Sequence, residues 1–285
     1  MTIFNLPPNL VSTGFSLASI VTWGSADFLG GYAAQRADAF LVTALAHGSG
    51  LVFVTAVALL QHAPFPNHVS VLWALAGGLS GGISLAVFYR ALSSGQMGLN
   101  APVAAVLGAS IPVAVGFALE GLPHALQIAG FLLAGLGIWF ICKPDHLTGP
   151  PEGMGLAILA GFGFAGFFLF MRQTGNSSAV WVASISKIAS LTLVGIIVAV
   201  KAMSGRLQRG RTGIAVLAGV LDVMGTVFYV CASQTGRLDV SVVLCSLYPM
   251  VTVLLAGIFL KERFTTLRLT GMAAALLAMP LITLK

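Results

Sequence analysis

Ten long apolar segments are the feature that most constrains how this chain can fold. A helix needs about 20 mostly apolar residues to cross the hydrocarbon layer of a membrane, which is roughly 30 Å thick. The first half of the chain contains five such segments, at Ser12–Ala34, Ala39–Leu60, Val69–Leu92, Gly98–Leu119 and Ala125–Cys142. The second half contains five more, at Gly153–Arg172, Val180–Ala202, Gly213–Ser233, Val240–Leu260 and Leu267–Leu284. Few of the 285 residues remain for an extramembrane domain, so any functional site is expected among the segments.

The segments are expected to be helices, because backbone amides in lipid have no water to bond and must be satisfied within the segment. A membrane barrel would need strands of about ten residues with alternating polarity. The sequence has no such alternation, and charged residues make up only 8% of the chain. A soluble domain has roughly 25% charged residues. The net charge of +6 is scattered between the segments, which argues against a nucleic-acid partner and favours a lipid bilayer. The sequence therefore predicts an all-α integral membrane protein.

A weak internal repeat divides the chain into two units, residues 12–142 and 153–284. Aligning each position i with i+141 pairs aromatic or glycine positions in order: Trp23 with Phe164, Phe40 with Trp181, Gly78 with Gly219 and Gly130 with Gly271. Aligning i with i+140 pairs Phe88-Tyr89 with Phe228-Tyr229. Each unit has five segments, an odd number, so the second unit would enter the bilayer from the opposite side. Inverted repeats of this kind are typical of secondary transporters, which bind their substrates near the bilayer midplane.

Several short motifs carry a resemblance to a known family. They are Trp23-Gly24, Phe88-Tyr89-Arg90-Ala91-Leu92, Phe228-Tyr229, Tyr248-Pro249, Leu260-Lys261-Glu262-Arg263-Phe264-Thr265 and Gly271. Together they resemble the EamA family of the drug/metabolite transporter superfamily, over essentially the whole chain. The resemblance implies ten transmembrane helices in two inverted five-helix repeats around a central cavity, from which small metabolites or amino acids are moved, often outward. The first half departs from the pattern at Leu119-Glu120-Gly121, and Pro112 is out of register with Pro249.

The basic residues give a prediction of orientation. Ten of the fourteen Lys and Arg fall in the odd-numbered connections, three fall at the termini or in even-numbered connections, and Lys187 lies inside a segment. Because cytoplasmic connections carry the excess of Lys and Arg, this count favours both termini outside the cytoplasm. Many members of the resembled superfamily have both termini in the cytoplasm, so the count and the resemblance disagree.

Three charged residues lie well inside segments, namely Asp27, Lys187 and Asp222. A charge at the middle of a span costs roughly 2.5 to 3.5 kcal/mol on insertion scales, so such residues normally face the interior and have partners. One ammonium cannot neutralise two carboxylates, which leaves one carboxylate as a candidate for proton coupling. We assign this role to Asp27, because an acid in the first helix resembles the small multidrug-resistance branch. The alternative is that Asp27 caps a helix break near Gly30-Gly31 or lies at the interface.

Aromatic residues on the same helical faces extend this set into a candidate substrate site. Trp23 precedes Asp27 by four positions, and Tyr229 follows Asp222 by seven, so each pair shares one helical face. The candidate substrate-binding residues are Trp23, Tyr89, Trp181, Lys187, Asp222, Tyr229 and Tyr248. The alternatives are that the aromatic residues are interface anchors or packing groups, and that Lys187 only pairs with Asp222. His47 is expected to be packed or water-bonded, and Pro112 and Pro249 could open the fourth and ninth helices.

These features predict a secondary transporter that exports small metabolites such as amino acids by alternating access, with proton exchange, in the inner (plasma) membrane of the cell. One alternative is a small multidrug-type efflux carrier. Alternatives of another class are an intramembrane enzyme or a non-transporting scaffold. The sequence contains no GxxxxGK[ST] motif and no HExxH motif, so neither ATP hydrolysis, nor other catalysis, nor a metal, nor a cofactor is expected. The sequence does not specify the substrate, the direction of flux, the coupling ion or the oligomeric state.

Overall fold

A computed structural model describes residues 7–94, 97–142, 152–200, 209–261 and 265–283. Within these residues the chain forms eleven helices and no strand, which confirms the all-α prediction. The helices are α1 (Pro8–Ala34), α2 (Ala39–Leu60), α3 (His68–Ser93), α4 (Met97–Glu120), α5 (Ala125–Cys142), α6 (Met154–Arg172), α7 (Ala179–Val200), α8 (Arg209–Thr235), α9 (Leu238–Cys245), α10 (Pro249–Phe259) and α11 (Thr266–Thr283).

Polar residues between the apolar segments set the helix ends. The side chain of Asp38 caps α2 by accepting hydrogen bonds from the backbone N–H groups of Phe40 and Leu41, at 2.9 and 3.2 Å. Asn67 caps α3 in the same way, at 2.9 Å from the N–H of Ser70. Such caps satisfy donors that have no partner inside the helix. As a result, the helices begin and end within a few residues of the predicted segments.

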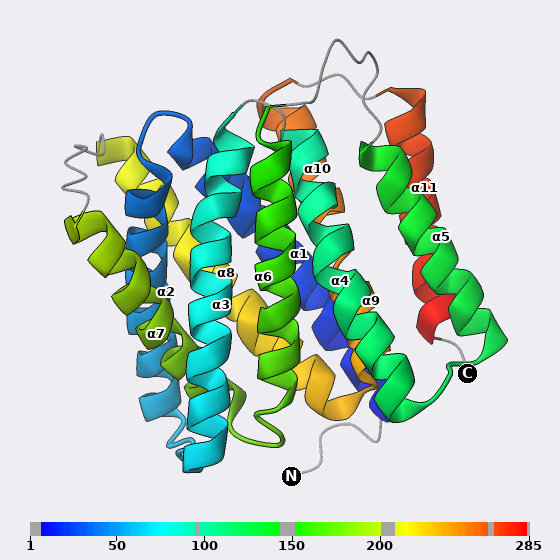
Figure 1. Cartoon of the computed structure of the whole chain (residues 1–285), viewed down its shortest axis with the longest axis horizontal. Coiled ribbons are helices and arrows are strands. Elements are labelled where there is room, and N and C mark those ends of the chain that lie inside the picture. The colour runs from blue at the N-terminus through cyan, green and yellow to red at the C-terminus, as the bar shows by residue number, and fades with distance from the viewer. Residues whose placement is uncertain (1–6, 95–96, 143–151, 201–208, 262–264, 284–285) are drawn as a thin grey trace.

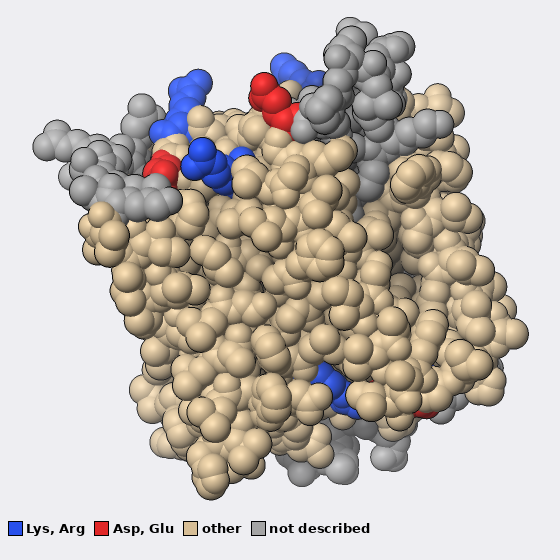
Figure 2. All heavy atoms as spheres, in the orientation of Figure 1, with Lys and Arg blue, Asp and Glu red and all other residues tan. Residues whose placement is uncertain are grey.

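Seven stretches of helix are long and apolar enough to cross a membrane, judged by length and composition. They lie in α2, α3, α4, α6, α7 and α8 and in the stretch Leu238–Phe259 that contains α9 and α10. The apolar parts of α5 and α11 are shorter. In Figure 2 the visible charged side chains lie near the two ends of the molecule, and a broad uncharged band separates them. This distribution fits a molecule that lies across a bilayer.

The helices lie side by side, and helices from the two halves of the chain alternate in the packing (Figure 1). Helix α1 packs along α8, α3 packs against α6 and α7, and α2 packs against α7 and α8. Helices α5 and α11 pack against each other at one edge of the molecule, away from this centre. The interior is therefore built from both halves, and its main hydrophobic cluster includes residues of α1, α3, α4, α6, α7 and α8.

The ninth apolar segment does not form one uninterrupted helix. It is divided into α9 and α10 by a turn over Ser246–Tyr248. Pro249 has no N–H to continue the helical hydrogen bonding, and the N–H of Tyr248 bonds to the carbonyl of Cys245, at 3.1 Å. The expected opening at Pro249 is confirmed. Helix α4 runs through Pro112 without a break, so the corresponding opening expected there is wrong.

The start of α1 and the end of α11 lie toward the same face of the molecule, which we call the terminal face (Figure 1). Helix α1 runs from the terminal face to the opposite face, where Arg36 follows it, and Arg90 lies at the same opposite end of α3. Arg172 and Arg237 lie on the terminal face, at the end of α6 and the start of α9. The spatial separation of these basic residues follows the connections counted in the sequence.

Candidate functional site

A cavity of about 50 Å³ lies among the central helices. The lining residues come from seven helices, α1 to α4 and α6 to α8, and from the turn between α9 and α10. They are Trp23, Asp27, His47, Gly81, Leu85, Ala104, Ala105, Gly108, Phe164, Phe167, Phe168, Ser186, Lys187, Ser190, Asp222, Thr226 and Tyr248. Apolar residues predominate, with a few polar groups among them, which is the usual composition of a small-molecule site. A volume of 50 Å³ is sufficient for a few water molecules.

An ion pair between Lys187 of α7 and Asp222 of α8 lies on the cavity wall. Both residues are buried, with 5% and 7% of their surface exposed. The ring Nδ1 of His47 on α2 lies 3.3 Å from the Lys187 Nζ. An ammonium group has only donors, so Nδ1 accepts and the second ring nitrogen carries the proton of a neutral imidazole. The alternative considered for Lys187, a pair with Asp222, is therefore present in this structure, with His47 as a third member.

Backbone contacts hold Asp222 in place. The indole N–H of Trp23 donates a hydrogen bond to the Asp222 carbonyl at 3.1 Å, and the Thr226 hydroxyl donates to the same carbonyl at 3.1 Å. Trp23 can reach this carbonyl because Gly225, on the next turn of α8, has no side chain where the indole lies. The aromatic residue of α1 thus fixes the helix that carries the carboxylate.

Asp27 lies one turn beyond Trp23 on α1 and also lines the cavity. Its surface is 6% exposed. Among the described residues, Asp27 forms no ion pair and no side-chain hydrogen bond, in contrast to Asp222. The charged groups on the described cavity wall are Asp27, Asp222 and Lys187, so one carboxylate lacks a cation, as the sequence suggested.

Trp23 is the centre of an aromatic cluster beside these charges. Its ring centroid lies 5.8 to 6.3 Å from those of four other residues, Phe167, Phe168, Tyr229 and Tyr248. The turn between α9 and α10 brings Tyr248 into the cluster. Gly24 on α1 permits this approach, since a Cβ atom there would lie 2.5 Å from the Tyr248 carbonyl. The cluster gives the cavity one aromatic wall.

The structure brings five of the eight predicted site residues to the cavity, namely Trp23, Asp27, Lys187, Asp222 and Tyr248. Tyr89 and Tyr229 lie close by but are fully buried, and their hydroxyls bond to backbone carbonyls of Ala26 and Phe168, at 3.5 and 2.9 Å. Trp181 is at the start of α7 on the terminal face, where its indole N–H bonds to the Ala63 carbonyl at 2.9 Å.

The other lining residues were not predicted as site residues from the sequence, and they include His47, Phe167, Phe168 and Ser190. A signal for His47 exists in the sequence. The i+140 alignment, which pairs Phe88-Tyr89 with Phe228-Tyr229, also pairs His47 with Lys187, whereas the i+141 alignment pairs Ala46 with Lys187. Phe167 and Phe168 carry no comparable signal, because phenylalanine is common throughout the apolar segments.

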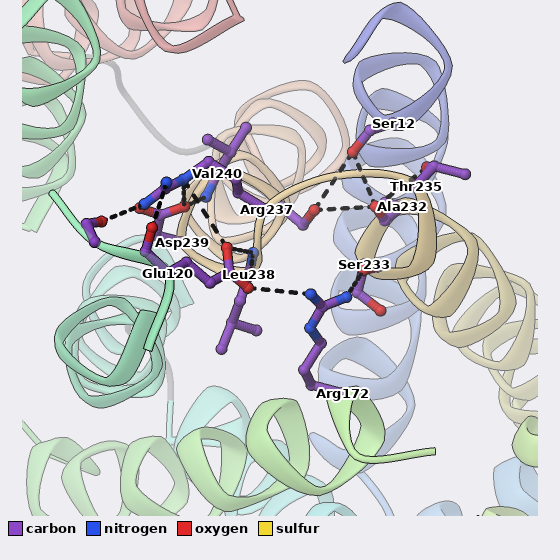
Figure 3. Close-up of polar contacts among 12 residues, drawn as sticks. Ser12, Glu120, Arg172, Ala232, Ser233, Thr235, Arg237, Leu238, Asp239 and Val240 are labelled. Carbon is purple, nitrogen blue, oxygen red and sulfur yellow. Dashed lines mark hydrogen bonds and ion pairs between the residues drawn. The ribbon is translucent and has the colours of Figure 1, made fainter. Parts of the chain in front are cut away.

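A second polar group, which we call the terminal-face cluster, consists of Glu120, Arg172, Arg237 and Asp239 (Figure 3). Arg172 of α6 pairs with Glu120 at the end of α4, at 3.0 Å. Arg237 contacts the other Glu120 oxygen at 3.9 Å and pairs with Asp239 at 2.9 Å. The hydrogen bond to Asp239 raises the pKa of the Arg237 guanidinium above its ordinary value, so Arg237 stays charged. The cluster ties together the ends of α4 and α6 and the start of α9.

Further contacts extend this cluster to α8 and α1. Arg172 also donates to the Ser233 carbonyl on α8, and the Leu238 N–H donates to Glu120 at 3.1 Å. Nearby, the Ser12 hydroxyl of α1 bonds to the Ala232 carbonyl at 2.9 Å (Figure 3). No group of three or more His, Cys, Asp or Glu side chains among the described residues could hold a metal ion.

Comparison with known proteins finds one matching family. The model of the EamA-like transporter family matches residues 151–284. The EamA-like transporter family is part of the drug/metabolite transporter superfamily, and this match covers a little under half of the chain. The resemblance found in the sequence is thereby confirmed for residues 151–284. EamA proteins are transporters, which fits the expectation that the chain is not an enzyme. No curated protein matches the chain.

Solved structures show that the fold of this chain is a known one. One crystal structure of a protein that is 18% identical superposes with a TM-score of 0.71, over 95% of this chain and 95% of that chain. The fold of the solved protein therefore extends over both halves of the present chain, including the half that the family model does not match.

Proposed function

We propose that this EamA-like protein is a secondary transporter that moves small organic solutes, such as amino acids, outward across the plasma membrane by alternating access. The observation that carries the proposal is the cavity among the central helices, where Asp27, Lys187 and Asp222 are enclosed by apolar residues. Buried charges are expensive in a membrane protein and normally mark a substrate or ion pathway. A scaffold without transport would not need them.

We include in this proposal ten spans arranged as two inverted five-helix repeats, with α9 and α10 forming the ninth span. Paired close contacts support it. A Cβ atom on Gly78 of α3 would lie 2.1 Å from the Ser186 carbonyl of α7, and one on Gly219 of α8 would lie 2.0 Å from the Ala46 carbonyl of α2. These residues are pairs under the i+141 and i+140 alignments, so equivalent positions make equivalent contacts.

The packing of the helices is also equivalent in the two halves. Helix α1 packs along α8 while α6 packs along α3, and α2 packs on α8 while α7 packs on α3. Each statement becomes the other when the helices of the two halves are exchanged. Two similar halves around a central site are what a carrier needs, since each half can move against the other and open the site to alternate sides.

The terminal-face cluster fits a gate in such a cycle. It joins α4 of the first half to α6 and α9 of the second, beside a small cavity. Opening the cavity toward the terminal face requires the contacts of Glu120 to break. The side chains of Glu120 and Arg172 are partly exposed, and ion pairs of this kind contribute about 0 to 1 kcal/mol each, so thermal motion can break them.

Asp27 is the proton-coupling residue in this proposal. Its carboxyl group lines the cavity with no cation partner among the described residues, so it can bind a proton when the substrate is absent and release it when the substrate enters. Exchange of a proton for the solute would supply the energy for export. A small multidrug-type carrier would use the same residue, and the aromatic cluster around Trp23 favours it as the second candidate.

The test is solute counterflow in proteoliposomes that contain the purified protein. A carrier accumulates labelled solute transiently when unlabelled solute is preloaded, whereas an enzyme would change the solute chemically and a scaffold would do neither. We expect saturable counterflow for at least one member of a panel of amino acids and organic amines. A panel without any counterflow would contradict the proposal.

A further inference from the structure

The charges on the cavity wall define what a bound solute must bring. Lys187 and Asp222 neutralise each other as a pair, and His47 accepts a hydrogen bond from that pair as a neutral ring. A positive charge on His47, whose ring nitrogen lies 3.3 Å from the ammonium, would be strongly repelled. Asp27 is then left as the unbalanced charge, and the described wall of the cavity carries a net charge of −1 when Asp27 is ionised.

The Lys187–Asp222 pair does not offer its ammonium to a ligand, because separating the pair is too costly. Both side chains are buried, and Trp23 and Thr226 fix the backbone of Asp222. A solute carboxylate that took Lys187 would leave Asp222 buried without a partner, which is strongly destabilising. The carboxylate of a zwitterion would therefore have no free cation among the described wall residues.

The aromatic wall supports the same charge preference. Trp23 lies one turn from Asp27 on α1. The rings of Phe167, Phe168 and Tyr248 surround the Trp23 ring. Aromatic faces attract cations, and the attraction is stronger where water is excluded. A carboxylate acceptor next to several rings is a suitable environment for an ammonium group on an apolar body.

We propose that the cavity selects solutes with one net positive charge over zwitterions and anions, and this proposal rests on the proposed function. The selected solutes are organic amines and cationic amino acids. The ammonium group pairs with the Asp27 carboxylate, and the proton that Asp27 carried leaves to the aqueous phase. The site is neutral both when Asp27 carries a proton and when a solute ammonium is bound, since either one balances the charge of the Asp27 carboxylate. The other titratable groups near this site are Lys187 on α7, Asp222 on α8, His47 on α2, Tyr89 on α3 and Tyr248 in the turn.

Three compounds with the same ring and different charges test the proposal: 2-phenylethylamine, phenylalanine and 3-phenylpropionate. Binding to the purified full-length protein is measured by the shift of its thermal unfolding, and counterflow is measured in proteoliposomes. We expect the amine to bind at least about tenfold more tightly than phenylalanine, and the anion not to bind. Asp27→Asn should weaken amine binding by about 30-fold or more, because it removes one partner of a buried charge pair. Asp27→Glu, which restores the charge, should recover most of it.

Asp38→Asn is the matched control, because Asp38 caps α2 and lies outside the cavity, and asparagine caps a helix as well as aspartate does. It should leave the binding of all three compounds unchanged.

If phenylalanine or phenylpropionate binds as tightly as the amine and shows counterflow, the charge selection is wrong while the carrier function stands. If Asp27→Asn folds and binds the amine as the wild type does, the charge selection is also wrong. If none of the compounds binds or exchanges, both proposals are contradicted.

Discussion

His47 and Lys187 lie 3.3 Å apart across the interface of α2 and α7, and 140 positions separate them in the chain. The same interval separates Tyr89 from Tyr229, whose hydroxyls both bond to the backbone of the first helix of their own half. Under the proposed repeat, His47 and Lys187 are equivalent positions that meet at this interface and carry different residues. The second half of the chain provides the ammonium, and the first half provides its neutral acceptor.

Removing the Lys187 ammonium should lower the stability of the folded protein. Lys187→Met leaves Asp222 buried without a cation, and breaking a buried ion pair from one side costs about 3 to 5 kcal/mol. The temperature of thermal unfolding in detergent should fall accordingly. The double variant Lys187→Met with Asp222→Leu should recover most of the loss, since both charges are gone. A double variant no more stable than the single one would contradict this role of the pair.

Asp27→Asn should remove the dependence of transport on a pH gradient, because asparagine cannot carry the exchanged proton. The wild type should exchange one proton for one cation, so that an imposed membrane potential leaves its flux unchanged while a pH gradient drives it. The measurement is solute flux in proteoliposomes under a pH gradient or under a potassium diffusion potential. Asp38→Asn should behave like the wild type. A pH-driven flux that persists in Asp27→Asn would exclude Asp27 as the coupling residue.

Glu120→Gln should loosen the terminal face. The change removes the ion pairs with Arg172 and Arg237, which lie partly in solvent, so the loss of stability should be about 1 kcal/mol or less. The access of reagents to the cavity from the terminal face should increase by more than this small loss of stability suggests. With Thr226→Cys in a background without other cysteines, the new thiol should react several times faster with an impermeant reagent added at the terminal face. Equal reaction rates with and without Glu120→Gln would show that the cluster is not a gate.

The glycines at the two equivalent helix crossings should tolerate no side chain. Gly78→Ala places a methyl group 2.1 Å from a backbone carbonyl of α7, and Gly219→Ala places one 2.0 Å from a carbonyl of α2. Overpacking of this kind costs typically about 1 to 3 kcal/mol. Gly195→Ala on α7, where nothing lies within 4 Å of the added atom, is the control and should be neutral or slightly stabilising. The readout is thermal unfolding, and equal values for all three variants would contradict the packing argument.

The helices could be predicted from sequence because a bilayer imposes one requirement on every span. Ala39–Leu60 and Ala125–Cys142 were predicted to the residue, since polar residues bound both segments. The break at Pro249 and the continuity at Pro112 could not be told apart, because both prolines lie in equally apolar surroundings and the outcome depends on which neighbours pack there.

The charged part of the site was also visible in the sequence, because Asp27, Lys187 and Asp222 stand out in apolar segments. The aromatic part was not. Trp181 is an aromatic residue in an apolar segment just as Trp23 is, yet it lies on the terminal face, and Tyr89 and Tyr229 direct their hydroxyls to backbone carbonyls. Which aromatic residues reach a cavity depends on helix rotation, which a single sequence does not encode in any local pattern.

The position of the unpaired acid on α1 has a consequence for biosynthesis. Helix α1 is not among the stretches that meet the criterion for a membrane span within the described residues, and it carries Asp27 together with buried Ser16 and Ser19. Ser19 and Trp23 of α1 donate hydrogen bonds to carbonyls of α8, and the Asp222 carbonyl that Trp23 contacts belongs to a residue translated 199 codons later. Until α8 is synthesised, α1 lacks its main packing partner, so we expect its stable insertion to depend on the second half of the polypeptide.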